Sequence, residues 1–518
     1  MVTAVDLLSK GYFPEQVIPP LNAKKLSDIL PHLLPNLSTY KPFSSKCCSF
    51  SVPKTNNYRR FFSIPNPLHQ TRLCVKIEEN WTEIVNHLKK SKISLIHLDP
   101  DPTSIRAFDR SSMLKQKKKE EILRSTSSRC VLISDISNFY STIYTHSIPW
   151  ALHGKEEAKK RKKDPELLGN ILDQNVRYTQ DQQTMGIPVG PDTSHIISEI
   201  IGSAIDIELI KKNPRLKRKG YRYVDDFGLF FSDWSIAESV QHDLEKILKY
   251  YELQPNANKT RIIDLPQPIE PQWVTDLRLF AFRSQETYQE SDLINYFSKV
   301  FYLSKKNPHQ NVMKYAIKRI KDYEINPDNW ELFESLLLKS IIAESTCMPV
   351  VTNLLYKYKY LYSGYPVNYA KRIQETIDEI IIFHSPFSHG YEVSWALWCA
   401  KTLNLKIGKR ATRHLNFCDD PIVTLISLDM QANKLLDNAE FDTSFLIEYM
   451  TADNLYDDHW LITYEALVKK WLKPFESDDY VKNDPFFSVL SKNNVQFYDE
   501  KLTESGIQIS PMIDPYAV

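Results

Sequence analysis

The feature that most constrains this chain is a pair of adjacent aspartates, Asp225 and Asp226, inside the apolar sequence YRYVDDFGLFF. The aromatic and β-branched residues on both sides predict a β-strand. Two neighbouring carboxylates in a half-buried strand are costly, because like charges repel and a buried charge needs a partner. A metal ion would supply that partner. The alternative is a hairpin turn, since aspartate also favours turns.

A third aspartate, Asp135, interrupts a second β-rich run, VLISDISNFY, 90 residues before Asp225. The joint occurrence favours a metal site over a simple turn. Two strands that each present a carboxylate can hold a pair of Mg²⁺ ions about 4 Å apart, which activates a 3′-hydroxyl and stabilises a pyrophosphate leaving group. The sequence therefore predicts phosphoryl transfer, with Asp135, Asp225 and Asp226 as the catalytic carboxylates.

Composition places the chain among globular proteins of the cell interior. Its 518 residues are 42% hydrophobic and 25% charged, a balance that excludes disordered, collagenous and membrane-spanning classes. The start, MVTAVDLLSKGYF, lacks the basic and long apolar segments of a secretory signal. The seven cysteines are odd in number and include no CxxC pair. We therefore expect a cytoplasmic protein with no membrane partner.

The net charge of +1 conceals an uneven distribution along the chain. Residues 1–290 hold 41 basic and 34 acidic residues, a charge of +7, whereas residues 291–518 hold 24 and 30, a charge of −6. Three basic runs, KQKKK, KKRKK and KKNPRLKRK, lie in the first part. Each run alone is typical of a solvated surface. Three runs together favour a nucleic-acid partner for the first part only.

The pattern along the chain predicts an α+β region followed by an all-helical region. Residues 1–130 mix short apolar stretches with proline, and residues 131–290 alternate strand-like runs with helical periodicity, including a helix over 193–210. In residues 291–518 amphipathic segments begin about every 21 residues, hence about 42 per helix pair, which is typical of HEAT-like repeats. The expected starts lie near residues 292, 311, 330, 350, 369, 391, 421, 442 and 459.

The order of the motifs resembles that of reverse transcriptases. Asp135 followed by Tyr140 resembles motif A, TMGIPVG at 184–190 resembles motif B, and YVDD at 223–226 is similar to the YxDD of motif C. NANKT at 256–260 resembles motif D, with Lys259 as its lysine, and LRLFAF at 277–282 resembles a primer-grip strand. The resemblance implies a right-hand polymerase, with fingers within residues 1–130 and a palm over 131–290.

Longer strings resemble the AbiK-like reverse transcriptases of bacterial abortive infection, an anti-phage class. These strings are GYFPEQVIPPL, RRFFSIPNP, YTHSIPWALHGK and SHGYEVSWAL. The resemblance implies a polymerase domain joined to a HEAT-like helical domain in residues 291–518. It also implies assembly into homo-oligomers and synthesis of single-stranded DNA from dNTPs without a template, starting from a protein hydroxyl, so that the DNA is covalently attached. The priming residue is not identifiable.

The resemblance also assigns site residues. Asp135, Asp225 and the carbonyl of Ile136 would hold two Mg²⁺ ions, with Asp226 as the neighbouring carboxylate. Tyr140 would be the aromatic gate that clashes with a ribose 2′-hydroxyl, while Phe139 serves the core. The other residues that the resemblance places at the nucleotide are Gly186, Pro188, Gly190 and Lys259. Independently of the resemblance, Arg106 and Arg110 of the expected fingers could bind triphosphate oxygens bidentately, although surface solvation is the commoner role for most arginines of that region. In the helical region, the commonest role of aromatics such as Tyr391, Trp395 and Trp398 is packing in the repeat core, and any of them that face outward would anchor subunit contacts. His389 and Glu392 would form a capping or interface pair.

One departure from the family pattern concerns whether the protein uses a template. Templated reverse transcriptases usually carry glutamine before the second glycine of motif B, where this chain has Val189, which cannot hydrogen-bond a base or phosphate. A templated RNA-directed DNA polymerase of retron or group II intron type remains an alternative, although the acidic residues 291–518 argue against it. A helical-repeat scaffold with a degenerate polymerase domain is the alternative from another class, and the intact aspartates argue against it.

Overall fold

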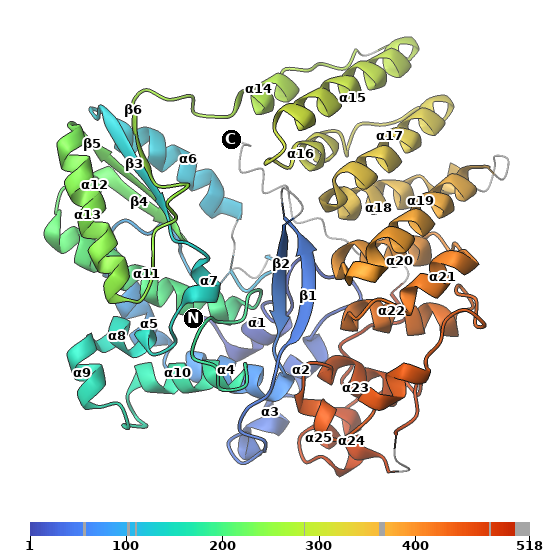
Figure 1. Ribbon diagram of the computed structural model, residues 1–518, viewed down its shortest axis with the longest axis horizontal. Coiled ribbons are helices and arrows are strands. Elements are labelled where there is room, and N and C mark those ends of the chain that lie inside the picture. Colours follow the sequence, from blue (N-terminus) through green and yellow to red (C-terminus); the bar gives the residue numbers. More distant parts are fainter. Residues whose placement is uncertain are drawn as a thin grey trace.

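The computed structural model describes residues 1–54, 58–100, 104–108, 111–283, 285–361, 368–475 and 478–502. Figure 1 shows a part that mixes a sheet with helices on one side of the molecule, and an array of helices on the other. A two-stranded hairpin lies between the two parts. This arrangement confirms the predicted α+β class.

The mixed part is built on a four-stranded antiparallel sheet. Its strands run in the order β4 (Gly220–Tyr223), β5 (Asp226–Phe231), β3 (Cys130–Asp135) and β6 (Arg261–Asp264). The sequence around the paired aspartates is therefore two strands rather than one, because Val224 and Asp225 form a turn between β4 and β5. The hairpin-turn alternative is correct for the backbone. It does not exclude the metal site, since Asp135 pairs directly with Asp226 across β3 and β5.

The two faces of the sheet have different neighbours. Alternate residues of a strand face opposite sides, and Leu132, Phe227 and Leu229 belong to the main core together with helices α11 (Asp192–Lys212) and α13 (Trp234–Tyr250). A smaller apolar cluster covers the other face and consists of Leu95, Val131, Tyr221 and Phe230. By the same alternation, Asp135 and Asp226 lie on this second face at the strand ends. Helix α11 confirms the helix expected over 193–210.

Helices that come before and after β3 in the chain surround the sheet. Those before β3 are α1 (Ala4–Ser9), α2 (Lys24–Asp28), α3 (Leu30–Leu33), α4 (Pro67–Glu79), α5 (Trp81–Leu88) and α6 (Ser111–Ser125). Those after it are α7 (Phe139–Thr142), α8 (Ser147–His153), α9 (Lys155–Lys160), α10 (Leu168–Tyr178), α12 (Leu216–Lys219) and α14 (Gln272–Arg278). Helix α6 contacts β4 and β5, and so lies beside the strands that carry the paired aspartates.

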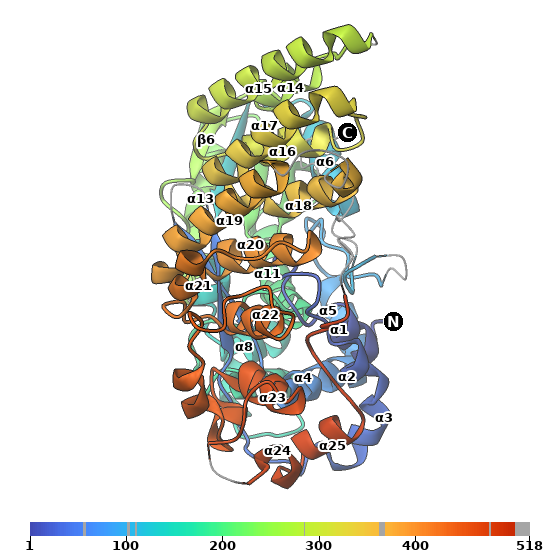
Figure 2. The same cartoon turned by 90° about the vertical axis from the view of Figure 1, so that its right-hand side faces the viewer.

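The helical part has helices in two stacked layers (Figure 2). One layer holds α15 (Gln289–Lys306), α17 (Trp330–Ala343), α19 (Asn368–His384) and α21 (Lys409–Leu415), and each contacts the next. The other holds α16 (Val312–Arg319), α18 (Met348–Lys357), α20 (Gly390–Thr402), α22 (Pro421–Ala432) and α23 (Trp460–Val468), followed by α24 (Tyr480–Asn483) and α25 (Phe487–Lys492).

The helix rhythm read from the sequence agrees with these bounds. Helical segments begin within three residues of each expected start, and the segment expected near 442 is a 3₁₀ helix at Ser444–Tyr449. Among the described residues between 289 and 468, α21 is the one α-helix that the rhythm does not predict. Within the described residues from 285 to 502 the structure contains no named strand. None of the described helices combines the length and apolar character that a membrane crossing requires.

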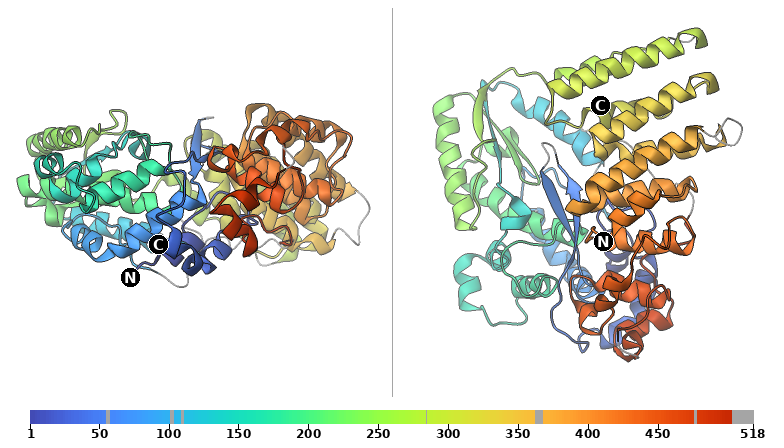
Figure 3. Two further views of the ribbon diagram at one scale, coloured as in Figure 1. Left: turned by 90° about the horizontal axis from the view of Figure 1, so that it is seen from below. Right: turned by 45° about the vertical axis from the view of Figure 1, so that its right-hand side comes forward.

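The hairpin of β1 (Cys48–Pro53) and β2 (Arg59–Ile64) joins the two parts (Figure 3). Helix α20 contacts β1, and the indole N–H of Trp460 donates to the carbonyl of Ile64 at 3.2 Å. Further toward the N-terminus, the ring of Tyr12 lies against that of Phe497. One apolar core therefore runs through both parts. The predicted boundaries at 130 and 290 mark changes in the sequence pattern and do not separate independent cores.

One expectation for the region after the sheet is wrong. No strand forms at 277–282, where α14 ends and an irregular segment follows. Its Phe280 and Phe282 instead pack on Tyr296 of α15. Tyr391, Trp395 and Trp398 are at most 3% exposed, which agrees with a place in the repeat core and leaves none of them facing outward. They stabilise the core of the helical part and are not accessible to a partner.

Candidate active site

Three carboxylates meet at the end of the sheet where β4 turns into β5. Asp135 ends β3, Asp226 begins β5 opposite it, and Asp225 lies in the intervening turn. One oxygen from each carboxylate lies within 4.8 Å of the others. The turn is held to β3, because the N–H of Ile136 donates to the carbonyl of Asp225 at 3.2 Å. The sequence correctly predicted that these three residues lie together.

The three carboxylates repel one another, and Asp225 shows the effect. Burial, together with the negative charges of Asp226 and Asp135, raises the pKa of Asp225 to about 6. A carboxyl group with a raised pKa gains most from a nearby cation, since the cation favours its ionised form. The cluster is therefore a site at which positive charge is strongly stabilised.

Two lysines from different elements supply positive charge around the carboxylates. The Nζ of Lys259 lies 2.7 Å from an oxygen of Asp135, and the Nζ of Lys117 on α6 lies 3.0 Å from an oxygen of Asp226. Burial lowers the pKa of Lys259, but the hydrogen bond to Asp135 and the charges of all three aspartates raise it overall. Both lysines therefore place a positive charge directly beside the carboxylates.

The segment around Asn256 fixes the orientation of Asp135. The backbone N–H of Asn256 donates to the carbonyl of Asp135 at 2.7 Å, and its side-chain amide donates to Oδ1 of the same residue at 3.0 Å. Next to this contact, the hydroxyls of Thr260 and Ser134 are 3.0 Å apart. The predicted motif D therefore packs directly against the end of β3.

The donor set fits a hard divalent cation. It consists of carboxylate oxygens, which Mg²⁺ prefers, and two of the three aspartates face each other from rigid strands. Asp135 and Asp225 are the residues that would hold the ions. The carbonyl of Ile136, adjacent to Asp135, is a further candidate ligand.

The segment resembling motif B runs beside the segment that follows Asp135. The N–H of Gly186 donates to the carbonyl of Ile143, and the N–H of Ile187 donates to that of Tyr140, at 2.8 and 2.9 Å. Gly186 has a φ of 83° and Gly190 one of 129°, both in the region that favours glycine. At Gly190 a Cβ atom would also lie 2.7 Å from Pro14.

These glycines, with the buried Pro188 between them, therefore serve the close packing of the segment. Their proposed contact with an incoming nucleotide remains a prediction.

Tyr140 lies on α7, directly after the strand that bears Asp135. Its hydroxyl is 3.1 Å from Nδ1 of His195 and accepts a hydrogen bond from Ser198 at 3.2 Å, so its ring is anchored on α11. The ring is half-buried, whereas the neighbouring Phe139 is only 2% exposed. The expected division between a core Phe139 and a more accessible Tyr140 agrees with this geometry. The function of Tyr140 as a gate remains a prediction.

The structure corrects the role expected for Arg106. Its buried guanidinium donates to the carbonyls of Phe13 and Gly190 and to the carboxylate of Asp192, at 2.5, 3.1 and 2.5 Å. Moving it toward a triphosphate would leave the buried Asp192 without its cation, which is strongly unfavourable. Arg106 therefore ties the N-terminal segment to the start of α11. Arg110, the other arginine expected to bind the nucleotide, lies outside the described residues.

A second group of potential metal ligands lies between the hairpin and α20. His384, His389 and Glu392 offer atoms within 4.8 Å of one another, and the Nδ1 atoms of the two histidines are 2.9 Å apart. Both oxygens of Glu392, however, accept hydrogen bonds from Arg59 at 2.5 and 2.8 Å. We therefore assign this group a structural role. The sequence indicated His389 and Glu392 as a pair but not the contribution of His384.

Comparison with known proteins agrees with the site. Residues 64–296 match the family described as "Reverse transcriptase (RNA-dependent DNA polymerase)". That part of the chain is therefore a reverse transcriptase domain, and the protein is a nucleotidyltransferase. The matched range contains all three aspartates and both lysines of the site. A comparison with curated proteins finds no match.

Among solved structures the chain is similar to telomerase from Candida tropicalis. A complex with a TWJ fragment of telomeric RNA is 12% identical, with 77% of this chain and 68% of that chain covered and a TM-score of 0.29. The apo enzyme is 11% identical, with 82% and 76% covered and a TM-score of 0.31.

Sequence reasoning missed Lys117 as a residue of the site. It belongs to the run KQKKK, whose composition favours a surface for nucleic acid. The run alone does not identify which of its lysines faces the carboxylates. That depends on which face of the helix packs toward the strands. The signal available in the sequence was only that the run precedes β3 closely.

Proposed function

We propose that this nucleotidyltransferase is a Mg²⁺-dependent DNA polymerase that acts in bacterial phage defence, and that it joins dNTPs without a template from a protein hydroxyl. The observation that carries the catalytic part is the meeting of Asp135, Asp225 and Asp226 within 4.8 Å, beside Lys117 and Lys259. The anti-phage part rests on the resemblance of four strings in the sequence to AbiK-like enzymes.

Each polar side chain of the site has a task in this reaction. Asp135 and Asp225 would bind the metal ions, and Asn256 keeps Asp135 in a fixed orientation through two hydrogen bonds. Lys117 and Lys259 would neutralise phosphate oxygens of the incoming nucleotide. When bound, the metal ions would lower the pKa of the attacking hydroxyl and stabilise the pyrophosphate that leaves.

The absence of a template is supported by two features of the chain. Val189 stands where templated enzymes usually have glutamine, and in the structure its carbonyl accepts from the N–H of Ser63 at 2.8 Å. Residues 291–518 carry a charge of −6, which disfavours a long nucleic-acid duplex beside them. A single strand that grows from the protein itself needs neither a template contact nor a long basic groove.

The helical part is proposed to be HEAT-like and to mediate assembly into homo-oligomers in the cytoplasm. The two layers of stacked helices support the first proposal. Among the described residues of the helical part, large aromatics that are more than 60% exposed are available for contacts between copies: Tyr302, Tyr360, Phe383, Phe387, Phe417 and Phe475. Sedimentation at micromolar concentration tests the assembly, and a monomer would contradict it.

A second candidate function is templated synthesis of DNA on RNA. The observation that favours it is the matched family, which is described as RNA-dependent. Both candidates use the same carboxylates. In the first the initial hydroxyl belongs to the protein and no template sets the order of bases, whereas in the second a primer supplies the hydroxyl and an RNA template sets the order.

One experiment separates the candidates. The full-length protein is incubated with labelled dNTPs and Mg²⁺ without nucleic acid, and the products are resolved on a denaturing gel before and after nuclease digestion. Label that migrates with the protein and is removed by nuclease supports the proposal. Label that appears only after an RNA template and a primer are added supports the second candidate, and the absence of label under both conditions contradicts both.

A further inference from the structure

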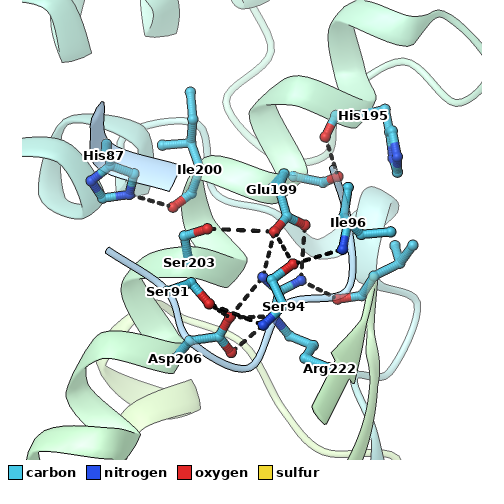
Figure 4. Close-up of polar contacts among 12 residues, drawn as sticks. His87, Ser91, Ser94, Ile96, His195, Glu199, Ile200, Ser203, Asp206 and Arg222 are labelled. Atoms are coloured by element: carbon cyan, nitrogen blue, oxygen red, sulfur yellow. Dashed lines mark hydrogen bonds and ion pairs between the residues drawn. The ribbon is translucent and has the colours of Figure 1, made fainter. Parts of the chain in front are cut away.

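Arg222, the residue before Tyr223 at the end of β4, has a fully buried guanidinium with a partner for each N–H (Figure 4). Its Nε donates to both oxygens of Asp206 at 2.9 Å, and its Nη2 lies 2.8 Å from one of them. Nη1 and Nη2 donate to the two oxygens of Glu199 at 2.9 and 2.7 Å. The one remaining N–H, on Nη1, donates to the carbonyl of Val224 at 2.9 Å.

Helix α11 is shaped to receive this side chain. Glu199, Gly202 and Asp206 lie three and four residues apart, hence on one face of the helix. A Cβ atom on Gly202 would be 2.7 Å from Cζ of Arg222, so glycine leaves the space that the guanidinium fills. Glycine is unfavourable inside a helix, and the close approach of Arg222 accounts for its presence there.

The carboxylates of this network have further hydrogen bonds from outside α11. Ser94 donates to Glu199 at 2.6 Å, and Ser91 donates to Asp206 at 2.7 Å. Both serines belong to the segment after α5, where the N–H of Leu95 donates to the carbonyl of Arg222 at 2.9 Å. Contacts from α11 and from the segment after α5 therefore hold Arg222 in place beside the turn.

The turn that it reaches carries a backbone conformation that needs support. Val224 has a φ of 58°, which is unusual for a β-branched residue and persists only when neighbouring groups enforce it. Its carbonyl accepts from Arg222, and the next residue is Asp225. The direction of the Val224 carbonyl fixes the peptide plane that leads into Asp225, and hence where that carboxylate points.

We propose that Arg222 is a positioning residue: held by Glu199 and Asp206, it locks the Val224 peptide so that Asp225 faces Asp135 and Asp226 in a geometry that binds divalent metal. This inference rests on the proposed metal-dependent function. Lysine could not replace it, because three N–H groups at one point cannot satisfy five acceptor positions spread over three residues.

The test uses a variant that removes the network without leaving a buried unpaired charge. Arg222→Met, Glu199→Gln and Asp206→Asn are combined, since replacing a whole buried ion network is often neutral for stability, whereas removing one member is not. A matched control combines Lys401→Met with Asp429→Asn, which removes a buried ion pair from the helical part.

Binding of Mn²⁺ alone to each full-length protein is measured from the loss of the free Mn²⁺ signal in electron paramagnetic resonance. The triple variant is expected to bind with a dissociation constant raised at least about fivefold, and to show kcat lowered at least about tenfold with the KM for dNTP changed less than about threefold. The control should match the wild type in all three quantities.

Gly202→Ala provides a second variant if the triple variant does not fold, because the added methyl group displaces the guanidinium and leaves every charge in place. It should raise the Mn²⁺ dissociation constant in the same direction. Unchanged Mn²⁺ binding and kcat in a folded triple variant, or in Gly202→Ala, would overturn the positioning role. Wild-type protein that binds no Mn²⁺ would contradict the proposed function itself, which separates the two failures.

Discussion

Arg59 and Glu392, 333 residues apart in the chain, form a bidentate ion pair with N–O distances of 2.5 and 2.8 Å. Arg59 lies on β2 of the hairpin, whereas Glu392 lies on α20 of the helical part. On the same strand, the N–H of Ser63 donates to the carbonyl of Val189 in the motif B segment. Contacts of the hairpin therefore connect the helical part to a segment beside the active site.

Removing Arg59 should destabilise the whole protein. In Arg59→Met the carboxylate of Glu392, which is 2% exposed, loses its cation, and we expect a loss of about 3 kcal/mol in the free energy of unfolding. The matched control is Lys46→Met, which removes an exposed ion pair to Asp457 and should cost about 1 kcal/mol or less. Urea unfolding of both variants measures the difference. Equal losses would show that the Arg59 pair contributes no more than a surface contact.

Replacing Tyr140 should weaken discrimination against ribonucleotides. Tyr140→Ala removes the ring that is expected to clash with the 2′-hydroxyl, and the ratio of kcat/KM for dNTP to that for rNTP should fall by at least about tenfold. Tyr140→Phe keeps the ring and loses only the hydrogen bonds to His195 and Ser198, so it should stay selective. If the alanine variant discriminates as well as the wild type, the gate lies elsewhere.

The two lysines of the site should act on the nucleotide rather than on stability. Lys117→Met and Lys259→Met each remove a cation beside the carboxylates, and we expect the KM for dNTP to rise by about tenfold. Lys119 is exposed on the same helix as Lys117, and Lys119→Met is the control. Steady-state incorporation kinetics measure the effect. A KM in the two site variants equal to that of the control would remove the lysines from the nucleotide site.

Acid should destabilise the contact between the hairpin and α20. Burial lowers the pKa of His384 against an opposite effect of Glu392, and with the smaller contributions of His389 and Arg59 the pKa is about 4. His384 therefore becomes protonated near pH 6.5 in the unfolded chain but only near pH 4 in the folded protein. The stability contributed by neutral His384 is complete above pH 6.5 and is lost as the pH falls toward 4.

His384→Gln should therefore reduce the slope of unfolding free energy against pH between 4 and 6.5. The control is His32→Gln, at an exposed position on α3. Urea midpoints at several pH values within that range give both slopes. A slope unchanged from the wild type in His384→Gln, or an equal reduction in both variants, would contradict this account of His384.

The elements with strong periodicity could be predicted from sequence, as the helix starts of residues 289–468 illustrate. The meeting of Asp135 with Asp226 was predictable for a similar reason, since few arrangements of two apolar strands tolerate carboxylates. The role of Arg106 was not, because it depends on Asp192, 86 residues away, and a buried arginine has no local signature. The strand expected at 277–282 is absent for the same reason, namely a contact that is distant in the sequence. The alternation of Phe280 and Phe282 is compatible with a strand, but both rings pack on the apolar surface of α15 instead.

The most direct test of the central claim is nucleotide incorporation by Asp225→Asn. The change keeps the volume and removes one charge from the carboxylate cluster, so incorporation of labelled dNTP should fall by about a thousandfold, which corresponds to several kcal/mol of lost transition-state stabilisation. Because burial, Asp226 and Asp135 raise the pKa of Asp225, thermal stability without metal should be unchanged or higher.

Asp264→Asn is the control, since Asp264 pairs with Cys130 at the opposite end of β3, and it should retain wild-type activity. Metal-dependent incorporation by Asp225→Asn within about tenfold of the wild-type rate would contradict the assignment of the active site.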